Sequence, residues 1–176
     1  PHTVAPTELT HALQSQGYGV LRAADVAQWA SSTVDALQAL SPVPVVTSSL
    51  CLLPDLLAHQ ERVGVLSIDA QSLTTLHWRG AGISTNQVGR LALGGLATDS
   101  HFAQSILGNQ AHLDADQAQQ EVVAAALSLV QESPQLKTLV LECTNLPPYQ
   151  SAIEMATGLK VLSLRDNPVL DKAANE

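Results

Sequence analysis

The chain has 176 residues, of which 45% are hydrophobic and only 14% charged, and its formal net charge is −8. A nucleic-acid binder needs a basic surface for the phosphate backbone, so this charge argues against one. No apolar run reaches the ~20 residues that span a bilayer, and no signal-peptide pattern is visible. We therefore expect a cytoplasmic protein without nucleic-acid or membrane partners; the oligomeric state is left open, a homo-oligomer included.

Helical and strand patterns alternate in the first third of the chain. Apolar residues recur at helical spacing over residues 25–40, and a β-branched run follows Pro42. The elements expected here are a helix over residues 7–16, a strand over 18–22, a helix over 25–40, a strand over 43–47 and a helix from Ser48 or Ser49 through Leu57.

The same alternation continues to the end of the chain. The expected elements are a strand over residues 62–68, a helix from Ser72 to Gly80, a strand over 88–93 ended by Gly94 and Gly95, a helix from Asp114 to before Pro134, a strand over 138–142, a helix over 147–157 stopped by Gly158, and a strand over 160–164. Alternating strands and helices predict an α/β fold with a mostly parallel sheet and right-handed crossovers.

Ligands of such sheets bind beyond the carboxyl ends of the strands. Three polar loops follow predicted strands, at residues 47–49, 67–72 and 143–145. Cys143 stands directly after a strand and four residues before Pro147, which favours the first turn of a helix. The positive end of that helix is expected to lower the pKa of the thiol and to favour the reactive thiolate.

The neighbours of Cys143 fit a site for a small anion. Thr144 and Asn145 supply hydroxyl and amide donors that can hold a carboxylate. Glu142 would raise the pKa of the thiol if its side chain approached, but strand alternation places it on the opposite face. The alternative is that Cys143 is a small buried hydrophobic residue, which is common for free cysteines.

The run LVLECTNLPPY at residues 139–149 resembles the second-half cysteine motif of the aspartate/glutamate/hydantoin racemase superfamily. The run VGVLSID at residues 63–69 is similar to the strand that opens the second half of those proteins, and VPVVTSSL at residues 43–50 to the strand that closes the first. The resemblance implies two pseudo-symmetric α/β lobes with the active site in the cleft between them. Residues 1–60 would be the remnant of the first lobe, residues 61–165 the second lobe and residues 166–176 a polar tail.

The resemblance also implies a function: a cofactor-independent racemase or isomerase of a small carboxylate, such as an amino acid or hydantoin. Two thiols, one per lobe, then act as acid and base on opposite faces of the substrate carbon. Cys143 would be the catalytic thiol of the second lobe. The residues implied to bind the substrate are Thr144, Asn145, Ser48, Ser49 and Ser67.

The sequence departs from this pattern in the first lobe, because no cysteine stands at residues 24–27, where the first-lobe thiol is expected. Cys51 and Asp25 are the candidates for a second acid/base, although the leucines beside Cys51 favour burial and Asp25 also suits a helix cap. A one-cysteine arylmalonate decarboxylase and a carboxylate-binding protein without turnover are the alternatives. The six histidines show no metal-ligand spacing, so no metal is expected. The resemblance implies chemistry without a cofactor.

Overall fold

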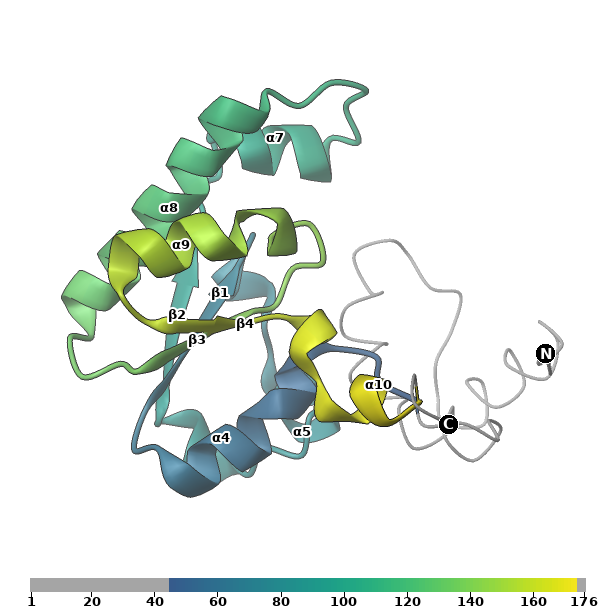
Figure 1. Cartoon of the computed structure of the whole chain (residues 1–176), viewed down its shortest axis with the longest axis vertical. Helices are drawn as coiled ribbons and strands as arrows, with labels where there is room; N and C mark the ends of the chain where they lie inside the picture. The colour runs from purple at the N-terminus through teal and green to yellow at the C-terminus, as the bar shows by residue number, and fades with distance from the viewer. Residues whose placement is uncertain (1–44, 174–176) are drawn as a thin grey trace, which may run out of the picture.

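The structure, a computed structural model, describes residues 45–173, in which helices and parallel strands alternate (Figure 1). The elements, with 3₁₀ helices labelled η, are η2 (Ser49–Leu52), α4 (Leu53–His59), β1 (Val63–Ser67), η3 (Ala70–Ser72), α5 (Thr75–Gly80), α6 (Thr85–Val88), β2 (Leu91–Gly95), α7 (His101–Leu107), α8 (Ala115–Glu132), β3 (Thr138–Leu141), η4 (Pro147–Tyr149), α9 (Gln150–Thr157), β4 (Lys160–Leu162), η5 (Leu164–Asp166) and α10 (Pro168–Ala173). The elements predicted over residues 7–16, 18–22 and 25–40 lie outside the described residues.

The four strands form one parallel sheet in the order β2-β1-β3-β4. Val65 in the middle of β1 is in register with Leu93 of β2 and with Val140 of β3. All five residues of β1 and all four of β3 are buried, as expected for central strands covered on both faces. The predicted α/β fold with a parallel sheet is therefore confirmed.

Two helical layers cover the sheet, and Figure 1 shows α8 and α9 on one side and α4 and α5 on the other. Leu66, Leu139 and Leu141 point from the strands into the core beneath α8 and α9. Val63, Val65 and Val140 alternate with them and pack against η2, α4 and α5. The helix that precedes β1 thus shares a core with the strands after residue 60. The predicted boundary between a first lobe over residues 1–60 and a second over residues 61–165 stays a prediction.

Local signals placed several helix ends correctly. The Asp114 side chain accepts hydrogen bonds from the N–H groups of Asp116 and Gln117 and caps α8, which ends before Pro134. Gly158 follows α9 with a φ of 70°, a left-handed conformation that glycine adopts without strain. Within residues 45–173, no helix is long and apolar enough to cross a membrane.

Other predicted boundaries were wrong. Residues 45–47 form no strand, since a β-branched run is only a propensity. Gly94 and Gly95 belong to β2 rather than ending it. The helix before Gly80 begins after Thr74, not Ser72, and α6 and α7 were not predicted. The polar tail contains the short helix α10.

Candidate functional site

The sheet order creates a topological switch point between β1 and β3. The chain leaves β1 for β2 on one side and then returns to place β3 on the other side of β1. Connections from these two central strands therefore diverge at their carboxyl ends, which is where open α/β sheets bind ligands. Ser67 ends β1 at this position, and Glu142 and Cys143 follow the end of β3.

Cys143 is a free, partly buried thiol at this edge of the sheet. The side-chain amide of Asn145 lies 3.9 Å from its sulfur, with the Nδ2 as donor. Burial raises the pKa of the Cys143 thiol above its ordinary value, although the backbone N–H of Asn145 opposes this; the negative charge of Glu142 raises it further. The predicted lowering of this pKa is therefore wrong. The helical segment after the thiol begins with the 3₁₀ turn Pro147–Tyr149.

Glu142 and Ser67 join the two central strands through their side chains. The Ser67 hydroxyl donates a hydrogen bond of 2.9 Å to Oε2 of Glu142, and the Glu142 N–H donates one to the Leu66 carbonyl. Burial raises the pKa of the Glu142 carboxyl, and the hydrogen bond from Ser67 opposes this. β3 ends at Leu141, so strand alternation no longer separates Glu142 from Cys143, and the charge of Glu142 acts on the thiol.

The predicted substrate-binding residues have different environments. Thr144 and Asn145 follow Cys143 in the loop, and both are exposed. Ser67 is buried, and its hydroxyl donates a hydrogen bond to Glu142. Ser48 accepts a hydrogen bond from the N–H of Leu50 and caps η2. Ser49 is 1% exposed, and its hydroxyl has no hydrogen-bond partner among the described residues. Their convergence on one anion site stays a prediction.

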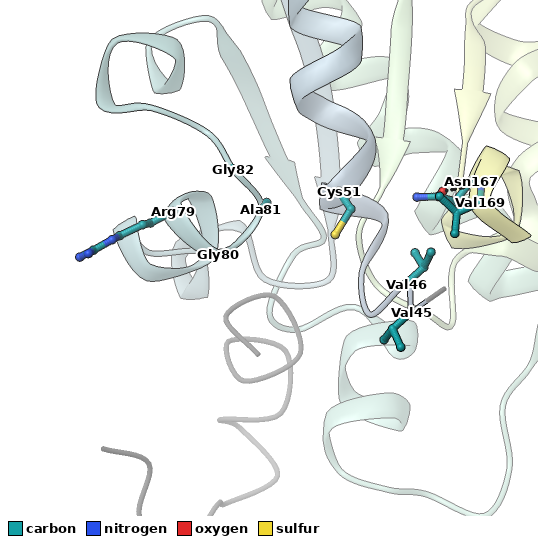
Figure 2. A pocket seen from close by; sticks show the side chains of 9 residues that line it. All are labelled: Val45, Val46, Cys51, Arg79, Gly80, Ala81, Gly82, Asn167 and Val169. Carbon is teal, nitrogen blue, oxygen red and sulfur yellow. Dashed lines mark hydrogen bonds between the residues drawn. The ribbon is translucent and has the colours of Figure 1, made fainter. Parts of the chain in front are cut away.

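Cys51, a candidate second acid/base, lines a cavity that does not include Cys143. It lies in η2 beside a cavity of about 390 Å³ whose other walls include Val46, Ala81 and Asn167. Figure 2 shows its sulfur directed toward this space, while the Arg79 side chain extends away from it. Burial raises the pKa of the Cys51 thiol, although nearby backbone groups of Ser48 and Thr47 lower it. Asp25, the other candidate, lies outside the described residues.

His77 lies in α5 and is buried among the described residues. His77 is 4% exposed, and its Nδ1 accepts the backbone N–H of Thr74 in a capping box at the start of α5. The described residues contain no group of three or more histidine, cysteine and acidic side chains that could hold a metal ion.

The residue that sequence reasoning missed is Glu142, whose side chain was expected on the far face of the sheet. A signal was present, because Ser67 and Glu142 both stand at the carboxyl ends of predicted parallel strands. Using it required knowing that β1 and β3 are neighbours. Ser67 and Glu142 are 75 residues apart in the sequence, so only the pairing of β1 with β3 brings them together.

No family model matches the chain. The chain is similar to a dimethylsulfoniopropionate lyase from Durusdinium sp. clade D, with 27% identity over 124 residues. The match covers 67% of this chain and 40% of that protein, so the chain spans less than half the length of the curated relative. The name of the relative describes a lyase whose substrate is a small molecule.

Proposed function

We propose that this chain carries the acid/base cysteine of an enzyme that transfers a proton at the carbon beside a carboxylate. The observation that carries the proposal is the position of Cys143: a partly buried thiol at the switch point between β1 and β3, with the Asn145 amide 3.9 Å from its sulfur. The similarity to a lyase of a small carboxylate supports the same chemistry.

The chemistry begins with removal of an α-proton, which is very weakly acidic beside a carboxylate. A thiolate at Cys143 can take this proton directly or through one water. The electron pair of the broken C–H bond then spreads onto the carboxylate as an enediolate. In this proposal Thr144 and Asn145 donate hydrogen bonds to that growing negative charge. Return of a proton from the opposite face by a second group would complete racemisation, and we propose membership of the aspartate/glutamate/hydantoin racemase superfamily on this basis.

A β-elimination is the second candidate, and the similarity to a dimethylsulfoniopropionate lyase favours it. In such a reaction Cys143 takes the α-proton, the C–H electron pair forms the carbon–carbon double bond, and the carbon–sulfur pair leaves with the sulfide. Elimination needs a base on one face only, so it does not require the missing first-lobe cysteine. Both candidates therefore share the proton removal and differ in the fate of the electron pair.

The test is a panel of amino acids, hydantoins and dimethylsulfoniopropionate incubated with the full protein in D₂O. NMR measures deuterium entering the α-position, a chiral separation measures racemisation, and gas chromatography measures sulfide and carbon dioxide. We expect Cys143→Ala to abolish α-exchange and any product, and Cys51→Ala to leave both nearly unchanged. α-Exchange of one enantiomer should outpace racemisation, because one thiol can remove and return a proton on its own face.

The products that form distinguish the proposed function from its alternatives. Carbon dioxide without exchange would replace the proposal with a decarboxylase, and ligand binding without any turnover would replace it with a binding protein. If Cys51→Ala proved as damaging as Cys143→Ala, Cys51 would be the second base and a two-thiol racemase would be the better description. Full activity in Cys143→Ala would remove the basis of the proposal.

A further inference from the structure

The cavity beside Cys51 is built from segments other than the Cys143 loop. It is lined by η2, by the turn after α5 and by the turn between η5 and α10, and its volume of about 390 Å³ is typical of small-molecule pockets. Val46, Ala81 and Val169 give it apolar walls, and the glycines on either side of Ala81 add no side chain there. These walls suit a small ligand with an apolar body.

The side-chain amide of Asn167 is buried at the edge of this cavity. The residue is 5% exposed, and its Oδ1 accepts the backbone N–H of Val169 at 3.1 Å, at the start of α10. Its Nδ2 group forms no hydrogen bond with the described residues, and Figure 2 shows it directed toward the side of the cavity where Cys51 lies. Buried N–H groups are rarely left without an acceptor, because desolvation without a hydrogen bond is costly. The amide therefore indicates a ligand that supplies an acceptor.

Among the described residues that line the cavity, no charged side chain points into it. Arg79 is the only charged residue of this set, and its side chain extends away from the cavity (Figure 2). Burial raises the pKa of the Cys51 thiol, so the sulfur stays uncharged at neutral pH. A charged ligand would lose its hydration here without gaining an ion pair. The cavity therefore favours an uncharged ligand.

We propose that this cavity is a second binding site, which holds a small uncharged molecule whose carbonyl-type oxygen accepts a hydrogen bond from Nδ2 of Asn167. The apolar walls cover the rest of the ligand, and Cys51 contacts it as a neutral thiol. The site does not depend on the proposed function, because Cys143 does not line it. The competing account is that solvent alone satisfies the Asn167 amide.

Three probes with the same five-membered ring separate these accounts. Cyclopentanone carries the acceptor, methylenecyclopentane has the same shape without it, and cyclopentanecarboxylate adds a charge. Binding to the full protein is followed by titration in proton–nitrogen NMR spectra, where the Asn167 side-chain amide and the backbone amides of Cys51 and Ala81 report on the cavity.

Two aspartate variants test the role of the amide. Asn167→Asp keeps an acceptor for the Val169 N–H and removes the donor that faces the cavity. Asn86→Asp is the control, because it makes the same change of charge at an exposed position of α6. The preference for the ketone over the alkene is compared within each variant, so that any general effect of the new charge on the cavity cancels.

We expect the wild type, Asn86→Asp and Cys143→Ala to bind cyclopentanone about three- to tenfold more tightly than methylenecyclopentane, and more tightly than the carboxylate. In Asn167→Asp the preference for the ketone should be lost or reversed, because two oxygens would then face each other.

Several results would overturn the inference. These are equal affinities for ketone and alkene in the wild type, a ketone preference that survives Asn167→Asp, or a carboxylate that binds as tightly as the ketone. Loss of binding in Cys143→Ala would place the probe at the other site. Absence of saturable binding at the cavity amides would leave the Asn167 amide to solvent.

Discussion

Burial and charge act in the same direction on the Cys143 thiol. Burial raises its pKa most, the Asn145 N–H opposes this, and the Glu142 charge raises the pKa further. The resting protein therefore holds Cys143 mainly as a thiol at neutral pH, and anything that neutralises Glu142 should increase the thiolate fraction.

Removing the Glu142 charge should make Cys143 more reactive. In a Cys51→Ala background, where Cys143 is the one remaining cysteine, we expect Glu142→Gln to raise the iodoacetamide alkylation rate near neutral pH by roughly threefold or more. The rates are followed by mass spectrometry, and Glu132→Gln in the same background should match the parent. An unchanged rate in Glu142→Gln would show that the Glu142 charge does not reach the sulfur.

His77 should make stability depend on pH. Burial lowers the pKa of its imidazole, although a backbone hydrogen bond at Thr74 opposes this. Below the unfolded-state value of about 6.5, the unfolded chain takes up a proton that the folded protein resists, so the folded state loses stability as the pH falls. The wild type should lose about 1 kcal/mol more than His77→Gln between neutral and mildly acidic pH.

Urea unfolding at both pH values measures this difference. Gln at the same position can still accept the Thr74 N–H in the capping box, so the substitution removes the titration and keeps the cap. Parallel loss of stability in wild type and His77→Gln would mean that other groups cause the pH dependence.

At the level of elements, two glycines let β2 approach its neighbours closely. A Cβ on Gly94 would lie 2.9 Å from Cδ2 of Leu129 in α8, and one on Gly95 would lie 3.0 Å from the backbone nitrogen of Ala70. Leu129 is buried in the core between α8 and the sheet. The helix can therefore pack on β2 at this distance because the strand has no side chain there.

Substitution of Gly94 should separate α8 from the sheet. We expect Gly94→Ala to lower the free energy of unfolding by about 1–3 kcal/mol, because the buried Leu129 must shift. Gly89→Ala is the matched control, since no atom lies within 4 Å of its Cβ and its φ is −63°, and it should be neutral or slightly stabilising. Chemical denaturation of both variants gives the comparison. Equal stability of the two variants would contradict the packing argument.

At the scale of the whole molecule, the order β2-β1-β3-β4 decides where a ligand can bind. It brings the ends of β1 and β3 together and makes them the switch point of the sheet. It also places η2, with Cys51, in the layer that covers Val65 and Val140, where the thiol lines a separate cavity. The two cysteines thus occupy different environments, and we expect only Cys143 to take part in the proposed reaction.

The sequence by itself determined the α/β class, the four strands of the described sheet over most of their length, and helix ends such as Asp114 and Gly158. These features depend on hydrophobic periodicity and on capping by residues within a few positions, so local sequence carries them. It also marked Cys143 as the reactive candidate.

Only the tertiary structure decided which strand ends are neighbours and what surrounds the thiol. The Ser67–Glu142 hydrogen bond, the raised pKa of Cys143 and the burial of His77 depend on packing between distant segments. The inclusion of Gly94 in β2 likewise depends on its pairing with Leu66 of β1. Local periodicity holds no information about such contacts, because desolvation and charge act through space rather than along the chain.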